Sequence, residues 1–358
     1  MVAPDDTLRP LVVRFGAIGD LIQLTSMLES LHRIWGRPVD VMTRSAVAAS
    51  VFRGLSHAGE VLAVGSRSAP YWTSPRQWRA VRSLRRAPAG PAWVIDQHPR
   101  AARALRRLLE RGGSDPELVC DTATVPRGSL EHTLDHHLRR ASFRPSGWPE
   151  APGAGPATPP PPRLAVADDE LDDCRRWLAR RGLADGPLVV VQTCSRNLKR
   201  GRWTRDRWRK AIAGILSTLP EGRVVLAGAP DERAEVRPLA AALGDPRVAE
   251  ATEDLPLRRL FALLILAHSC VSLDTGPAHA AAALGCPLVV LAGRADPRRC
   301  QPRPDRAPVE VVASIPPVEW PDDPLEWQRR NRMEEIEVDA VLEAWRRATA
   351  VSCGAPQL

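Results

Sequence analysis

The sequence contains no Cys-x-x-Cys pair, although it has seven cysteines, at positions 120, 174, 194, 270, 286, 300 and 353. Structural metal sites and disulfide frameworks usually place their cysteines at short, regular spacings. The scattered positions argue against both kinds of site. They predict free thiols that are mostly buried.

No part of the chain has the composition of a membrane span. Its longest stretch without a formal charge, residues 275–293, contains three glycines and two prolines, which suit a spanning helix poorly. Residues 1–10 are polar and show no basic segment followed by an apolar core, so we expect no export signal. The predicted location is the cytoplasm.

Lysine is almost missing, since Lys199 and Lys210 are the only two and nearly all of the positive charge is arginine. The formal net charge is +8. Such a surplus favours anionic partners, for example nucleotide phosphates, phosphorylated glycolipids or nucleic acid.

The 358 residues are enough for two domains of common size. In the first part, short apolar runs alternate with helical stretches, and apolar residues recur at helical spacing from Leu21 to Trp35. We predict strands at 11–15, 39–42, 61–64, 93–96 and 118–120. This alternation is typical of a parallel sheet covered by helices on both faces.

A proline-rich segment follows this first pattern. From residue 143 the composition changes to Pro, Gly and Ala, and the segment ends in four prolines at 159–162, which indicates a stiff, extended linker. The alternation then restarts, with strands expected at 188–191, 224–228, 270–273 and 288–293 and helices at 168–181, 205–219, 231–243 and 255–267. The sequence is irregular after residue 303, and a last amphipathic helix is expected at about 334–348.

These patterns divide the chain into four parts. They are an N-terminal domain (1–145), a linker (146–163), a C-terminal domain (164–333) and a C-terminal helix with tail (334–358). The predicted fold class is α/β, with two doubly wound, Rossmann-like domains facing a cleft.

Residues 272–285 carry the most informative local pattern. An apolar run ends at Leu273, Asp274-Thr275-Gly276 forms a turn, and Pro277 stands where a helix takes its first residue. A strand that opens into a helix N-terminus presents free N–H groups and a positive dipole end. We interpret the stretch as a diphosphate cradle in which Thr275 and the Gly276 amide contact oxygens. An ordinary βαβ turn has the same pattern.

Four segments together resemble a known family. They are Arg14–Ile22 with Thr25 just after it, Val94–Gln97, Asp274–His279 and Gly293–Arg299. In this order and spacing they resemble glycosyltransferase family 9, the heptosyltransferases of bacterial cell-surface polysaccharide synthesis. The resemblance runs along most of the chain. It implies the GT-B fold and the transfer of a sugar, typically heptose from an ADP-activated donor, to a hydroxyl with inversion and without an essential metal.

The resemblance assigns Asp20 as the catalytic base. Inversion by direct displacement needs one base for the acceptor hydroxyl and one clamp on the leaving diphosphate. The implied clamp is Thr275, the Gly276 amide and His279, around Pro277. Asp274 either caps the helix or touches the donor sugar. For Asp20 a helix N-cap is the alternative role, and a histidine one turn into a helix is commonly structural.

Residues 192–203 depart from the family pattern. Family members commonly carry a lysine two residues before Trp203, where this chain has Gly201. Lys199 is our first choice for the replacement, because a point charge on a flexible stem tolerates displacement. Arg200 and Arg202 are alternatives, and solvated loop charges are the competing interpretation. The departure weakens the assignment of a heptose donor more than that of the fold.

Further donor contacts are assigned at the ends of two strands. Asp231 or Glu232, after the strand that ends at Gly228, would accept hydrogen bonds from ribose hydroxyls. A helix N-cap is the alternative for Asp231. Thr193, after the strand at 188–191, is assigned to the same site.

Two arginine-rich segments are assigned to the acceptor. Arginine forks bind phosphate bidentately, and the resemblance implies a lipid acceptor that carries phosphates and acidic sugars. Solvated helix faces are the alternative for each single arginine. The residues assigned are Arg67, Arg76, Arg79, Arg100 and Arg103.

No metal site is expected. The segment Glu131–His137 contains three histidines, but no Cys or His nearby completes a shell, and helical histidines need not converge.

The leading hypothesis is a metal-independent inverting glycosyltransferase without a cofactor. Its co-substrate is a nucleotide sugar, ADP-heptose, and its acceptor is a phosphorylated, lipopolysaccharide-type glycolipid reached by peripheral contact with the inner membrane. One alternative is a different nucleotide sugar or a non-lipid acceptor. Another is an inactive basic module that binds anions or nucleic acid. Because Asp20 and the 274–277 turn are both intact, we expect no nucleic acid partner.

Overall fold

The computed structural model describes residues 9–66, 73–86, 89–95, 99–121, 125–144, 148, 150–195 and 202–350. For residues 9, 89, 99–101 and 121 it describes the backbone alone. The chain divides into two compact units, Met1–Ala165 and Val166–Leu358.

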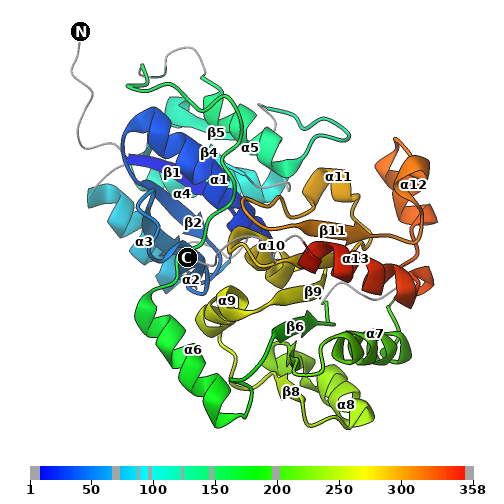
Figure 1. Cartoon of the computed structure of the whole chain (residues 1–358). Coiled ribbons are helices and arrows are strands. Elements are labelled where there is room, and N and C mark those ends of the chain that lie inside the picture. The colour runs from blue at the N-terminus through cyan, green and yellow to red at the C-terminus, as the bar shows by residue number, and fades with distance from the viewer. Residues whose placement is uncertain are drawn as a thin grey trace. The chain divides into compact units, whose positions relative to one another are not determined.

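The first unit is built on a five-stranded parallel sheet with the order β3-β2-β1-β4-β5 (Figure 1). The strands are β1 (Arg9–Val13), β2 (Val39–Thr43), β3 (Ala58–Ala63), β4 (Ala89–Val94) and β5 (Val119–Asp121). The helices are α1 (Ile18–Trp35), α2 (Ala48–Phe52), α3 (Pro75–Arg86), α4 (Pro99–Arg111) and α5 (Thr133–Ser142). Helix α1 packs with α2 and α5, whereas α3 packs with α4, so helices cover both faces of the sheet.

Helix α1 shows why the first unit folds as the sequence predicts. Its apolar positions Leu21, Leu24, Leu28 and Leu31 are all buried, as their helical spacing indicates. The helix ends at Gly36, whose φ of 67° is the left-handed conformation that glycine adopts at a helix C-terminus.

The second unit is built on a six-stranded parallel sheet with the order β11-β10-β9-β6-β7-β8 (Figure 1). The strands are β6 (Leu188–Gln192), β7 (Arg223–Ala227), β8 (Val248–Ala251), β9 (Ser269–Leu273), β10 (Leu288–Leu291) and β11 (Val309–Val312). The helices are α6 (Asp168–Arg180), α7 (Arg205–Thr218), α8 (Arg233–Leu243), α9 (Leu257–Leu266), α10 (Gly276–Ala283), α11 (Pro297–Cys300), α12 (Pro324–Arg330) and α13 (Val338–Ala350). Every residue of β6, β9 and β10 is buried, as expected for central parallel strands.

Four elements of the second unit, β8, β11, α11 and α12, were not predicted from the sequence. Strands β8 and β11 were not predicted, because Glu250 and Glu310 interrupt their apolar residues and both strands are only partly buried at the sheet edges. Helix α12 lies in the stretch that we interpreted as irregular.

The domain boundaries also differ from those predicted at 145, 163 and 333. The proline-rich segment packs along α1 within the first unit, where the Gly153 N–H donates to the Ile34 carbonyl (2.9 Å). Further along, the Arg163 N–H donates to Thr25 Oγ1 (2.9 Å). Helix α13 belongs to the second unit, since buried Trp345 donates to Ser269 Oγ (2.9 Å). The chain is therefore divided once, after Ala165.

Two further predictions concern cysteines and membrane spans. None of the six cysteines in the described part of the chain forms a disulfide, and five of them are buried. Within the same residues, no helix is both long and apolar enough to cross a bilayer.

Candidate functional site

The second unit has a topological switch point between β6 and β9. From β6 the chain builds outward through β7 to β8, and it then returns to place β9 on the other side of β6. In open α/β sheets, ligands bind outside the carboxyl ends of the strands at this point. Here those ends are Gln192 and Leu273.

The turn after Leu273 leads into α10 as predicted, one residue earlier than expected. Thr275 is the N-cap in an extended conformation, Gly276 is the first helical residue and Pro277 follows it. The first N–H groups of a helix have no partner within it, so the Gly276 amide is available to an anion. Asp274 precedes the N-cap, and its predicted capping role is therefore not the one adopted.

A buried glutamine holds this turn in place. Thr275 Oγ1 lies 3.1 Å from Gln192 Oε1, and Ser272 Oγ lies 3.3 Å from the same atom. The Gln192 amide group donates in turn to the Cys194 carbonyl. Sequence analysis did not assign Gln192, although a polar residue at the end of an otherwise apolar strand was a usable signal.

Asp274 lies in a largely enclosed position, with 17% of its side chain exposed. Its Oδ1 is 3.7 Å from His279 Nε2, and its Oδ2 is 3.8 Å from Cys300 Sγ. Burial raises the pKa of Asp274 to about 6, against a smaller lowering by the Cys300 thiol. The structure thus brings three polar groups together at the start of α10. Cys300, on α11, was not predicted as part of the site.

The loop after β10 is fixed by side chains from the C-terminal part of the unit. Asn331 Nδ2 donates to the carbonyls of Ala292 (3.0 Å) and Gly293 (2.8 Å). Trp327 Nε1 also donates to the Gly293 carbonyl (3.2 Å). These hydrogen bonds fix the start of the segment between β10 and α11, the helix that carries Cys300.

The other predicted donor residues lie at the ends of β6 and β7. Thr193 directly follows β6, and its Oγ1 is 3.6 Å from Cys194 Sγ. Glu232 accepts from the Ala229 N–H (2.8 Å), so it closes a capping box at the end of β7. Ala229 takes the N-cap position that was the alternative for Asp231. Lys199, Arg200 and Gly201 lie outside the described residues.

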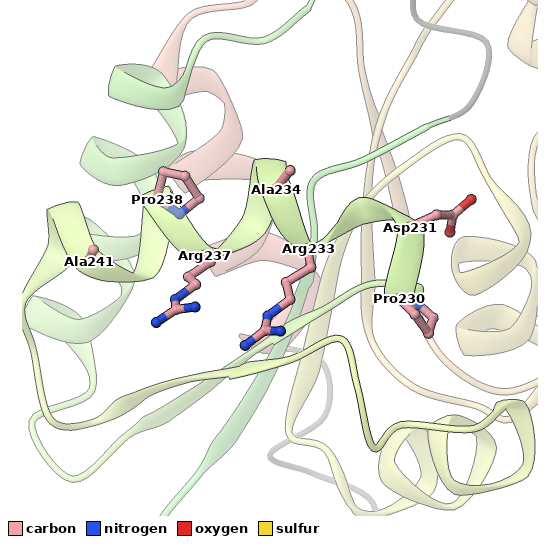
Figure 2. A pocket seen from close by; sticks show the side chains of 7 residues that line it. All are labelled: Pro230, Asp231, Arg233, Ala234, Arg237, Pro238 and Ala241. Atoms are coloured by element: carbon pink, nitrogen blue, oxygen red, sulfur yellow. The ribbon is translucent and has the colours of Figure 1, made fainter.

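Asp231 borders a hollow on the surface of α8, shown in Figure 2. The hollow has a volume of about 600 Å³, and the side chains of Arg233 and Arg237 line it. Arg202, an alternative for the donor cation, pairs with Glu235 (2.7 Å).

The first unit has its own switch point, between β1 and β4. Asp20 lies in the first turn of α1, where its Oδ2 accepts from the Ala17 N–H (2.8 Å). Asp20 is thus the third helical residue of a capping box, and Ala17 is the N-cap. Asp20 Oδ1 accepts from Arg14 Nη2 (2.8 Å), and Arg14 Nη1 donates to the Ile95 carbonyl after β4 (3.2 Å). Arg14, which had no assigned role, therefore orients the predicted base.

Gly16 makes room for Asp20, and replacing it with alanine is expected to displace the carboxylate. A Cβ at residue 16 would lie 2.4 Å from the Asp20 Cβ, so the first turn of α1 must shift. We expect a loss of about 1–3 kcal/mol of unfolding free energy, measured by urea denaturation, together with loss of the sugar transfer that the family resemblance implies.

Gly36→Ala is the matched control at the other end of α1. Its new methyl group has no atom within 4 Å. The only expected cost is about 1 kcal/mol of unfolding free energy, because alanine disfavours the positive φ of this position. Retained activity in Gly16→Ala would contradict the role given to this glycine.

The predicted acceptor arginines lie on exposed helix surfaces. Arg76 and Arg79 on α3 and Arg103 on α4 are exposed, and these helices do not share the sheet face with α1. The structure does not bring these arginines to Asp20. Arg67 and the side chain of Arg100 lie outside the described residues, as do Asp96 and Gln97.

The histidine-rich segment has structural contacts. His132 caps α5 by accepting from the Leu134 N–H (3.2 Å), and His136 Nε2 lies 2.8 Å from the Val125 carbonyl. His137 is buried. Within the described residues, no group of three His, Cys, Asp or Glu side chains is placed to hold a metal.

Two doubly wound parallel-sheet units, each with polar residues at its switch point, define a two-domain α/β protein of the GT-B type. Residues 154–315, most of which lie in the second unit, match the model of glycosyltransferase family 9 (heptosyltransferase). This match confirms the predicted resemblance over residues 154–315, a little under half of the chain.

Solved structures support the same fold. A glycosyl transferase family 9 protein from Veillonella parvula has a TM-score of 0.74 at 15% identity, with 98% of this chain and 100% of that chain covered. E. coli ADP-heptose lps heptosyltransferase II has a TM-score of 0.73 at 17% identity, with coverages of 97% and 100%. The iron-containing dodecameric glycosyltransferase TibC from enterotoxigenic E. coli H10407 has a TM-score of 0.50 at 14% identity, with coverages of 95% and 77%. No curated protein sequence matches the chain.

Proposed function

We propose that the protein transfers a sugar, heptose from ADP-heptose, to a hydroxyl of a phosphorylated glycolipid of the lipopolysaccharide type, with inversion at the anomeric carbon. The single observation that carries this proposal is the turn at the switch point of the second unit. There β9 leads through a short turn into α10, whose N-terminus suits an anion. The Thr275 side chain lies at this N-terminus and is held in place by Gln192. The ADP-heptose donor is supported by the family and by the name of the E. coli structural neighbour.

The proposed chemistry needs no covalent intermediate. Asp20 takes the proton of the acceptor hydroxyl as that oxygen attacks the anomeric carbon. The bond from this carbon to the nucleoside diphosphate breaks, and the leaving oxygen keeps the electron pair. The Gly276 amide and Thr275 stabilise the charge that develops on the diphosphate. Thr275 Oγ1 turns its proton from Gln192 to a phosphate oxygen, and Ser272 continues to contact Gln192.

We propose that this reaction uses neither a metal nor a cofactor. The proposal rests on the α10 N-terminus as the clamp on the leaving diphosphate. The neighbour TibC is iron-containing, so the proposal is tested by measuring transfer after dialysis against a chelator. A loss of activity that Fe²⁺ restores would refute it.

The acceptor side is proposed to contact an anionic lipid surface at the cytoplasmic face of the inner membrane. Helix α3 exposes Arg76, Arg79 and Arg82 around Trp78, whose side chain is 45% exposed. Basic residues beside an exposed tryptophan suit the headgroup region of a bilayer.

Thr275→Ala is expected to weaken binding of the ADP-sugar by about 10–100-fold, because a hydrogen bond to a charged group contributes about 1.5–3 kcal/mol. Isothermal titration with ADP, UDP, GDP and their sugars measures this effect and the nucleotide preference together. Thr218→Ala is the control, since Thr218 lies on the exposed surface of α7 and donates within its own helix (3.0 Å). If the unmodified protein binds no nucleotide, the proposed function fails. Salt-dependent DNA binding in its place would then favour a basic binding module.

A further inference from the structure

The Thr275 hydroxyl shares its two hydrogen-bond acceptors with the hydroxyl of Ser272. Thr275 Oγ1 lies 3.1 Å from Gln192 Oε1 and 3.2 Å from the Leu273 carbonyl oxygen. Ser272 Oγ lies 3.3 Å from the same Oε1 and 2.8 Å from the same carbonyl oxygen. Each hydroxyl carries one proton to donate. Either hydroxyl is therefore placed to serve both acceptors.

The sheet places Gln192 and Ser272 side by side. They are register partners in the neighbouring strands β6 and β9 (Figure 1). The Gln192 amide nitrogen donates to the Cys194 carbonyl, so the end of the amide that meets the two hydroxyls is its oxygen. This oxygen accepts and cannot donate, and it depends on a hydroxyl for its proton.

The two hydroxyls differ in what they can reach. Thr275 is partly exposed at the start of α10, where its hydroxyl can turn to a ligand. Ser272 is fully buried and Gln192 is 3% exposed, so a ligand at the α10 turn does not reach either of them. A buried acceptor that loses its donor costs free energy, because no water replaces the lost partner.

We propose that Ser272 is a positioning residue for the clamp on the donor diphosphate. The Thr275 hydroxyl turns to a phosphate oxygen when the nucleotide sugar binds, and the Ser272 hydroxyl keeps Gln192 Oε1 and the Leu273 carbonyl in hydrogen-bond contact. The buried acceptors then have a donor in both the free and the bound protein, so Thr275 is released at little cost. The inference rests on the proposed function, because it takes the nucleotide diphosphate as the ligand at this turn.

Ser272→Ala is the decisive variant, and titration of the full chain with ADP measures its effect. In this variant Thr275 alone serves the two acceptors, and binding of the diphosphate takes its proton away from them. The affinity for ADP is expected to fall about 5–100-fold, the effect of leaving a buried acceptor without its donor. Adenosine has no diphosphate, so its affinity should stay within about twofold.

Ser269→Ala is the matched control on the same strand. Ser269 is also fully buried, and its Oγ accepts from Trp345 Nε1 (2.9 Å). Its removal costs stability, as the loss of any buried hydrogen bond does. Because Ser269 has no contact with the α10 turn among its hydrogen bonds, the affinity for ADP should stay within about twofold.

A double-mutant cycle of Ser272 and Thr275 separates positioning from a general structural role. In a Thr275→Ala background no hydroxyl leaves the acceptors on binding, so Ser272→Ala should change the ADP affinity by less than about twofold. Stability should couple in the opposite direction. Each single variant keeps one hydroxyl on the acceptors and the double variant keeps none, so its loss of unfolding free energy in urea should exceed the sum of the two single losses.

Three results would overturn the inference and leave the proposed function standing. One is a Ser272→Ala variant that binds ADP as the unmodified protein does. Another is an equal loss of affinity for ADP and adenosine, which would make Ser272 a structural residue of the pocket. The third is additive losses of stability in the cycle, which would show that the two hydroxyls do not share their acceptors. An unmodified protein that binds neither ADP nor an ADP-sugar refutes the proposed function, and the inference with it.

Discussion

Asp20→Asn is expected to lower the rate of sugar transfer by about 10²–10⁴-fold, the usual contribution of a positioned general base, and to leave binding of the ADP-sugar unchanged. The asparagine carbonyl can still accept from the Ala17 N–H, as Asp20 Oδ2 does. The helix start is therefore kept, but no group remains to take the acceptor proton. Single-turnover rates and titration of the donor measure the two effects separately.

A second capping box provides the control for Asp20. In α6, Glu170 Oε2 accepts from the Ala167 N–H (3.0 Å) in the same arrangement. Glu170→Gln should change stability and leave the rate of chemistry as it was. If Asp20→Asn transfers sugar at the unmodified rate, Asp20 acts only as a capping residue.

Asp274→Asn is expected to stabilise the protein above pH 6. Burial raises the pKa of Asp274 from 3.8 to about 6 in the folded state. Between these pH values the folded chain binds more protons than the unfolded chain, so its stability falls as pH rises. Each unit of the shift corresponds to about 1.4 kcal/mol, which gives about 3 kcal/mol in total. Asparagine stays neutral and does not lose this free energy.

Urea unfolding at pH 4 and pH 8 measures the difference between Asp274→Asn and the unmodified chain. The variant should gain little at pH 4 and gain most at pH 8. Asp206→Asn should show no such gain at pH 8, because Lys210 and Arg209 lower the pKa of this exposed carboxylate. An Asp274→Asn variant that is less stable at pH 8 would contradict the enclosed position of the carboxylate.

The elements that the sequence predicts well are those with uninterrupted patterns. The apolar run of β6 and the helical spacing of α1 are both confirmed. The edge strands β8 and β11 were missed because each contains a glutamate and is only partly buried. In such strands the alternation of apolar residues is too short to distinguish them from loops.

The contacts of the candidate site are of two kinds, those between residues close in the sequence and those between residues far apart. Asp20 was assigned from its local motif, but its partner Arg14, only six residues away, was given no role. The contact of Thr275 with Gln192 spans 83 residues, and that of Cys300 with Asp274 spans 26. The topology of the sheet creates both, and a single sequence carries no local pattern for either.

The proline-rich segment along α1 has a consequence for anyone who separates the protein into its halves. A gene fragment that stops at codon 145 would lack two hydrogen bonds to α1. These are the bond from the Gly153 N–H to the Ile34 carbonyl and the bond from the Arg163 N–H to Thr25 Oγ1. A fragment that stops at codon 165 keeps both. The boundary for expressing the first unit alone therefore lies about twenty codons beyond the point that composition suggests.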